Sequence, residues 1–88
     1  MSGRLSIVIP TLNEARRLPS ALAPLVAGVM EGLVKQVIVA DGGSTDETVA
    51  IAEAAGCDLI ASEKGRAKQL RTGADVATGE WLLFLHAD

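Results

Sequence analysis

Short apolar runs recur at regular intervals along the 88-residue chain. Each run is rich in Ile, Val or Leu and is continuous rather than alternating, as is typical of a strand with both faces buried in a parallel sheet. We predict four strands from these runs, at Leu5–Pro10, Gln36–Ala40, Cys57–Ala61 and Trp81–His86.

The segments between the runs have the spacing of helices. Apolar residues at steps of three and four predict one face of an amphipathic helix. The three stripes are Leu18, Leu22, Leu25, Val29 and Leu33; Val49, Ala52 and Ala55; and Leu70, Ala74 and Ala77. Three helices that alternate with four strands predict an α/β fold, with a parallel sheet and helices on both of its faces.

Polar residues indicate where two of the helices begin. Ser44 and Glu47 have the spacing of a capping box, which predicts a helix that begins just after Ser44. Asn13 is a candidate cap for the first helix. Because Pro19 fits poorly deep inside a helix, we expect that helix to begin nearer Leu18, or its first turns to be irregular.

The main functional signal is the position of the polar residues. In sheets of this kind, ligands bind beyond the carboxyl ends of the strands, where the strand order reverses. Nearly every suggestive polar residue follows a predicted strand, in the segments Pro10–Glu14, Asp41–Ser44, Glu63–Arg66 and His86–Asp88.

The second of these segments begins with a carboxylate and two glycines. Asp41 could bind a hydroxyl or a base N–H, or it could simply begin a tight turn; its place at the expected crevice favours a functional role. For Ser44, Asp46 and Glu47 we favour a structural role at the start of the second helix.

Other strand ends carry further candidates. Glu14 and the Thr11 hydroxyl could hold a ribose or a base, or could be cap residues, and their spacing does not decide between these roles. Arg66 lies at the predicted start of the third helix, where a cation opposes the helix dipole unless an anion binds. It therefore suits a diphosphate, whereas Lys68 and Arg71 fit a solvated face.

The last predicted strand ends with an imidazole and a carboxylate. His86 and Asp88 lie two residues apart, on the same side of an extended chain, and could share a divalent ion. Cys57, the single cysteine, excludes an internal disulfide and a multi-cysteine metal site. We expect it to pack in the sheet without an activated thiol.

Composition narrows the class of protein. An apolar fraction of 49% excludes intrinsic disorder, and a net charge of -3 without a basic run gives nucleic-acid binding no electrostatic support. No apolar stretch approaches the roughly 18–20 residues of a membrane span, and the N-terminus lacks the pattern of a signal peptide. We expect a soluble, cytoplasmic chain.

Together these residues resemble the N-terminal half of a family 2 glycosyltransferase with the GT-A fold. The resemblance rests on Ser6–Glu14, Val37–Asp46 and Gly79–Asp88, and it covers essentially the whole chain. The third-helix pattern, Gly65-Arg66-Ala67 with Gln69, Gly73 and Ala74, is similar to a bacterial branch that includes enzymes associated with arsenosugar biosynthesis.

The resemblance implies a fold and a site. It implies a Rossmann-like sheet in the order 3-2-1-4, with residues 1–88 as the nucleotide-diphospho-sugar-binding portion of a domain cut at its Asp-x-Asp-like motif. The implied donor-binding residues are Pro10, Thr11, Asn13, Glu14, Asp41, Gly42, Arg66, Gln69 and His86. Asp88, with His86 as a second candidate ligand, would bind Mg²⁺ or Mn²⁺.

The implied activity is transfer of a sugar, with inversion, from a nucleotide-diphosphate donor to an unknown acceptor, and a UDP-sugar is favoured. The family's catalytic base lies downstream of Asp88, so we expect the 88 residues alone to transfer no sugar. Two positions depart from the family pattern: His86 replaces the first acid of Asp-x-Asp, and Gly42 replaces an acid that many members carry.

One other function is compatible with a chain of this kind, and a second class of function is disfavoured. The alternative is a non-catalytic module that holds a nucleotide with the same loops. A dinucleotide oxidoreductase or a methyltransferase is disfavoured, because no G-x-G-x-x-G follows the first strand. In the order 3-2-1-4 the last strand would have a neighbour on one side only, so we also expect self-association through this apolar edge.

Overall fold

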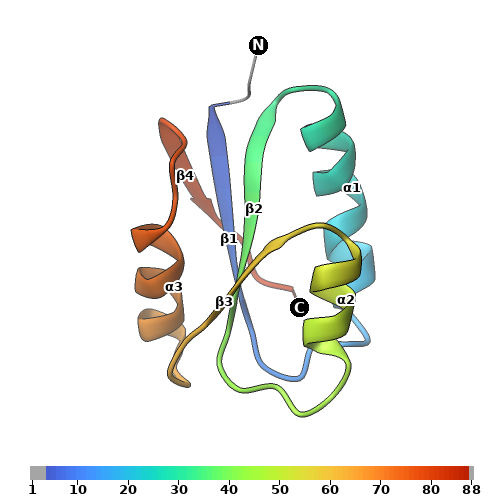
Figure 1. The fold of residues 1–88 in the computed structure, drawn as a ribbon, viewed down its shortest axis with the longest axis vertical. Coiled ribbons are helices and arrows are strands. Elements are labelled where there is room, and N and C mark those ends of the chain that lie inside the picture. Colours follow the sequence, from blue (N-terminus) through green and yellow to red (C-terminus); the bar gives the residue numbers. More distant parts are fainter. Residues whose placement is uncertain (1–3, 88) are drawn as a thin grey trace.

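Four strands form one parallel sheet in the order β3-β2-β1-β4. The computed structural model describes residues 4–87. Its elements are β1 (Leu5–Thr11), α1 (Leu18–Met30), β2 (Val34–Asp41), α2 (Thr48–Ala54), β3 (Asp58–Ala61), α3 (Arg66–Asp75) and β4 (Trp81–Phe84) (Figure 1). The predicted α/β class and the strand order are both confirmed.

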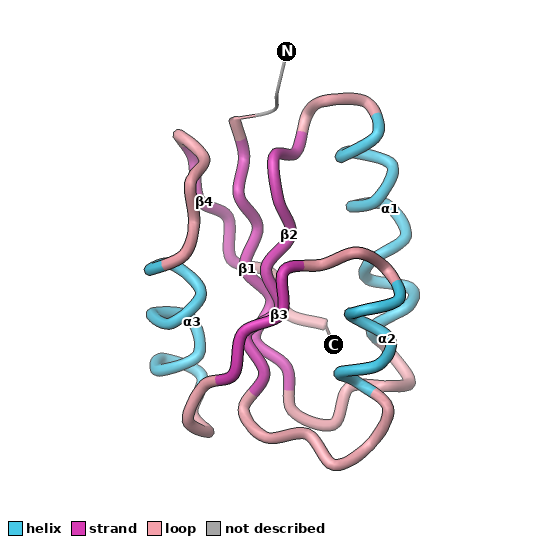
Figure 2. Tube along the Cα trace, in the orientation of Figure 1, coloured by secondary structure: helices cyan, strands magenta, loops and turns pink. Residues whose placement is uncertain are grey.

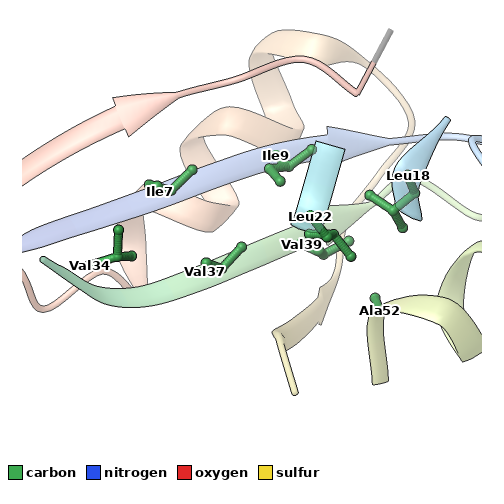
Figure 3. Close-up of a cluster of buried hydrophobic side chains, with 8 residues drawn as sticks. All are labelled: Ile7, Ile9, Leu18, Leu22, Val34, Val37, Val39 and Ala52. Atoms are coloured by element: carbon green, nitrogen blue, oxygen red, sulfur yellow. The ribbon is translucent and has the colours of Figure 1, made fainter. Parts of the chain in front are cut away.

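Helices cover both faces of the sheet, as the alternating pattern predicts. Figure 2 shows α1 and α2 on one side of the strands and α3 on the other. On the first side, Ile7 and Ile9 of β1 pack with Leu18 and Leu22 of α1 (Figure 3). On the α3 side, the buried core consists of Val8, Ile38 and Ala40. Because side chains alternate along a strand, the continuous apolar runs of β1 and β2 fill both cores.

The helix starts differ in part from the expectation. α1 begins at Leu18 with Pro19 in its first turn, where proline is well tolerated, so this expectation is confirmed. Neither Asn13 nor another side chain caps α1. α2 begins at Thr48, whose N–H donates to Asp46 at 2.9 Å, so the Ser44–Glu47 capping box was a wrong prediction. The Ser44 hydroxyl donates instead to the carboxylate of Asp41.

The strand β4 is shorter and more exposed than predicted. It ends at Phe84 rather than at His86, and its four side chains are 40–68% exposed. It pairs with β1 on one side, and among the described residues no strand pairs with its other side. An edge position therefore explains the exposure of an apolar run that resembles a buried strand. Within the described residues, no helix is long and apolar enough to cross a membrane.

Candidate functional site

A pocket of about 220 Å³ lies where β1 ends and α3 begins. In Figure 1 the end of β1 and the start of α3 both lie toward the bottom of the view. Its lining consists of Pro10, Thr11, Leu12, Glu14, Lys64, Gly65, Arg66 and Gln69. The fold therefore brings together two segments that lie about fifty residues apart in the sequence, at the carboxyl ends of the strands, as expected for an α/β sheet.

The pocket gathers most, but not all, of the predicted donor-binding residues. Those that line it are Pro10, Thr11, Glu14, Arg66 and Gln69; those that do not are Asn13, Asp41, Gly42 and His86. Three residues that line the pocket were not predicted to bind the donor: Leu12, Lys64 and Gly65. All three lie within the polar segments at the predicted strand ends. The charge of Lys64, two residues before Arg66, was the available signal.

The charges of the pocket come from two cations and one acid. Lys64 and Arg66 are exposed, and neither forms an ion pair with another described residue. Glu14 is half-buried, and no described side chain donates to its carboxylate. The pocket thus presents positive charge at the start of α3 and one available carboxylate at the end of β1.

Gln69 forms the floor of the pocket. It is only 4% exposed, and its Nε2 donates to the carbonyl oxygens of Thr11 at 2.8 Å and Ala40 at 2.9 Å. Its Oε1 accepts a hydrogen bond from the Gly65 N–H at 3.2 Å. Both N–H groups of the amide are therefore used inside the protein, and the side chain ties β1 and β2 to the loop before α3.

Asp41 organises the loop after β2. Its Oδ1 accepts hydrogen bonds from the hydroxyls of Thr11 at 2.7 Å and Ser44 at 2.6 Å. Its Oδ2 accepts from the N–H groups of Gly43 at 3.1 Å and Ser44 at 2.8 Å. Because a carboxylate has about four acceptor positions, these bonds occupy all of them.

The same contacts set the ionisation of Asp41. The side chain is 6% exposed, and this burial raises its pKa. The hydrogen bonds from Ser44, Thr11 and Gly43 favour the charged form and outweigh burial, so the pKa of Asp41 lies below its ordinary value. Asp41 is therefore a charged group at neutral pH that is held by its own loop rather than directed into the pocket.

Asn13 joins the loop after β1 to the loop after β2. Its backbone has φ 54°, a left-handed conformation that asparagine tolerates better than most residues. Its N–H donates to Ser44 Oγ at 2.8 Å, and its Oδ1 accepts from the Thr45 N–H at 2.8 Å. The next N–H, that of Glu14, donates to Thr48 Oγ1 at 2.9 Å. These contacts hold Glu14 in place beside the pocket.

The predicted metal ligands lie at the end of the chain. His86 is exposed and follows β4, whereas Asp88 lies outside the described residues. Residues 4–87 contain no group of three or more His, Cys, Asp or Glu side chains that could hold a metal ion. The role of Asp88 as a metal ligand stays a prediction.

A second hollow, of about 190 Å³, lies beside α1, α2 and the start of β2, and none of the predicted donor-binding residues lines it. Cys57 is part of its lining. Burial, and to a smaller extent the charge of Asp58, raise the pKa of the Cys57 thiol, so it stays protonated at neutral pH. This agrees with the expectation of a thiol that is not activated, whereas Cys57 lies just before β3 rather than in the sheet as predicted.

Comparison with known proteins decides the family. The family model described as glycosyl transferase family 2 matches residues 6–88. The chain belongs to this family. The family expected from the sequence resemblance is thus confirmed.

Relatives of this chain include mycobacterial glycosyltransferases. A PGL/p-HBAD biosynthesis glycosyltransferase of Mycobacterium tuberculosis is 41% identical over 94% of this chain and 34% of its own length. Glucosyl-3-phosphoglycerate synthase of Mycolicibacterium smegmatis is 32% identical over 96% of this chain and 30% of its own length. The chain therefore spans about a third of these relatives. They give no support to the narrower expectation of an arsenosugar branch.

Solved structures agree with the assignment to the GT-A fold. Glucosyl-3-phosphoglycerate synthase from Mycobacterium tuberculosis, crystallised with Mn²⁺, UDP and glucosyl-3-phosphoglycerate, superposes with a TM-score of 0.84 at 27% identity. The match covers 98% of this chain and 34% of the synthase. The same synthase was also crystallised with Mn²⁺, UDP-glucose and phosphoglyceric acid.

Proposed function

We propose that this chain supplies the donor-binding part of a glycosyltransferase, and that the pocket between β1 and α3 receives a nucleotide-diphosphate sugar. The observation that carries the proposal is the gathering of Glu14, Lys64 and Arg66 around one pocket at the carboxyl ends of the strands. The UDP and UDP-glucose in the solved synthase structures favour a UDP-sugar as the donor.

The two cations suit the diphosphate. Arg66 is the first residue of α3, and Lys64 precedes it by two residues. Positive side chains at a helix N-terminus are unfavourable next to the dipole, unless a negative ligand lies between them and the helix. A diphosphate at this position would relieve that repulsion and would accept hydrogen bonds from both side chains and from the first N–H groups of α3.

The carboxylate of Glu14 suits the hydroxyl groups of the ribose or an N–H of the base. Asp41 is less suited to this task than the sequence suggests, because its four acceptor positions are already used. In the proposal, Glu14 contacts the donor, whereas Asp41 and Asn13 fix the loops that carry it.

A divalent cation, Mg²⁺ or Mn²⁺, is also part of the proposed site. Asp88 is its candidate ligand, and His86 is a second candidate. The Mn²⁺ in the solved synthase structures supports this part. A cation bound to a diphosphate stabilises the negative charge of the leaving group. Inversion at the sugar stays a prediction from the family resemblance, and a cytoplasmic location stays a prediction from the composition. No described residue is assigned as the catalytic base.

Titration of the chain with UDP, with and without Mn²⁺, tests the proposal. We expect Arg66→Gln to weaken UDP binding about tenfold, the loss of one charge-assisted hydrogen bond. Arg71→Gln is the matched control, because it makes the same charge change on α3 at a residue that does not line the pocket. Absence of UDP binding, or equal effects of the two substitutions, would overturn the proposal.

A transfer assay with UDP-glucose separates an enzyme from a binding module. We expect the 88 residues to bind UDP without turnover. If a chain extended to the length of the curated relatives binds UDP but transfers no sugar, over a panel of donors and acceptors, that result would favour the non-catalytic module.

A further inference from the structure

Gly42 lies against the side chain of Gln69. A Cβ atom at position 42 would come within 2.9 Å of Gln69 Oε1 and 3.0 Å of its Cδ. The backbone of Gly42 is not in the left-handed region, in contrast to that of Gly43, which has φ 102°. Position 42 therefore requires glycine for a steric reason and not for its backbone conformation. The side-chain amide of Gln69 occupies the volume that a Cβ atom would need.

Both residues bind the same atom at the end of β1. The Thr11 carbonyl oxygen accepts hydrogen bonds from the Gly42 N–H at 2.9 Å and from Gln69 Nε2 at 2.8 Å. Gln69 also holds Ala40 and the Gly65 N–H, so one buried amide fixes both walls of the pocket. A shift of this amide would move Thr11 and Gly65, which line the pocket.

We propose that Gly42 and Gln69 form a coupled pair that sets the geometry of the donor pocket. Gln69 acts as a positioning residue, and the absence of a side chain at Gly42 leaves room for the Gln69 amide. This inference rests on the proposed donor site. With Gln69 in place, a side chain at position 42 would collide with its amide, so glycine at position 42 and glutamine at position 69 fit together. The pocket then has a neutral amide on its floor.

A second glutamine provides a matched control. Gln36 also joins separate segments: its Oε1 accepts from the Ser6 hydroxyl at 2.8 Å and the Thr78 N–H at 2.7 Å, and its Nε2 donates to Asp58 at 2.9 Å. It lies near the start of β2, at the opposite end of the sheet from the pocket. Loss of Gln36 should weaken the fold without any effect on the donor pocket.

UDP titration separates a positioning role from a purely structural one. Gln69→Met keeps most of the side-chain volume but removes the two N–H donors of the amide. Gln69→Ala removes these donors and most of the side-chain volume. We expect either variant to weaken UDP binding at least about fivefold, and Gln36→Met to leave it within about twofold of the unsubstituted chain. Unchanged UDP affinity in folded Gln69→Met, or an equal loss in Gln36→Met, would overturn the positioning role.

A double-mutant cycle tests the coupling without any ligand. We expect Gly42→Ala to lower the urea midpoint of the chain clearly, and to have little effect when Gln69 is already alanine. An equal loss in both backgrounds would overturn the pairing. If the unsubstituted chain bound no UDP, the proposed function and the positioning role would fall together, whereas the cycle would still decide whether Gly42 and Gln69 are coupled.

Discussion

Four hydrogen bonds surround the carboxylate of Asp41, at the scale of a single residue. Burial raises the pKa of this group, and the hydrogen bonds from Ser44, Thr11 and Gly43 lower it further than burial raises it. The folded pKa therefore lies below the unfolded value of about 3.9. Asp41 stabilises the fold at neutral pH, and this contribution is lost as the pH falls through about 3.9 to the folded pKa.

We predict that Asp41→Asn lowers the free energy of unfolding at neutral pH by about 1–3 kcal/mol, because an amide cannot accept all four hydrogen bonds. The difference from the unsubstituted chain should narrow below about pH 4, because the carboxylate of the unfolded chain takes up its proton at a higher pH than the hydrogen-bonded carboxylate of the folded chain. Urea unfolding at neutral and acid pH measures both effects. Asp75→Asn, at an exposed position on α3, is the control. The prediction would be wrong if Asp41→Asn lost the same free energy of unfolding at neutral and at acid pH.

Asp41 also shows how far single residues could be predicted. Its position at a strand end identified it as important from the sequence alone. What its oxygens bind depends on Ser44, three residues later, and on Thr11, thirty residues earlier. Ser44 has capping-box spacing with Glu47, but its hydroxyl donates to Asp41, and only the folded chain decides between these partners.

At the scale of elements, α3 approaches β1 very closely through Gly73. A Cβ at this position would overlap one methyl group of Val8 and lie 3.1 Å from the other, and Gly73 is buried. We predict that Gly73→Ala lowers the free energy of unfolding by about 1–3 kcal/mol, although alanine favours helices by about 1 kcal/mol over glycine. Chemical denaturation measures the change. In a Val8→Ala background the penalty should shrink, and an undiminished penalty would contradict the proposed overlap.

Apolar spacing located α3 but not the residues that it buries. The stripe of Leu70, Ala74 and Ala77 indicates a helix in the right place, whereas the buried residues of α3 are Gln69 and Gly73. A pattern that counts apolar residues cannot detect a buried amide with three hydrogen bonds, or a glycine that is required by close packing. For this reason the sequence could predict the helix, while the floor of the pocket needed the structure.

At the scale of the whole molecule, the order of strands decides which apolar runs are buried. The runs of β2 and β4 look alike in the sequence, yet residues 37–40 are at most 7% exposed and the side chains of β4 at least 40%. β2 lies between β1 and β3, whereas β4 lies at an edge of the described sheet. Parallel pairing and both helical layers followed from the pattern alone; the order came from the family resemblance.

The exposed edge at β4 leads to a prediction about association. Trp81, Leu82, Leu83 and Phe84 carry no charge and no proline that would discourage pairing with another chain. We therefore expect the 88-residue chain to self-associate as its concentration rises. Leu83→Lys, at a side chain that is 42% exposed, should shift the chain toward monomers, because a charge on an edge strand opposes strand addition.

Sedimentation velocity over a range of concentrations measures this association. Ala50→Lys is the control. It adds the same charge at an exposed position on the helix α2, which is not part of the β4 edge. Urea midpoints of both variants exclude unfolding as the cause of any change. The prediction of self-association would be wrong if the unsubstituted chain stayed monomeric at every concentration. Equal association of Leu83→Lys and Ala50→Lys would show that the β4 edge has no part in it.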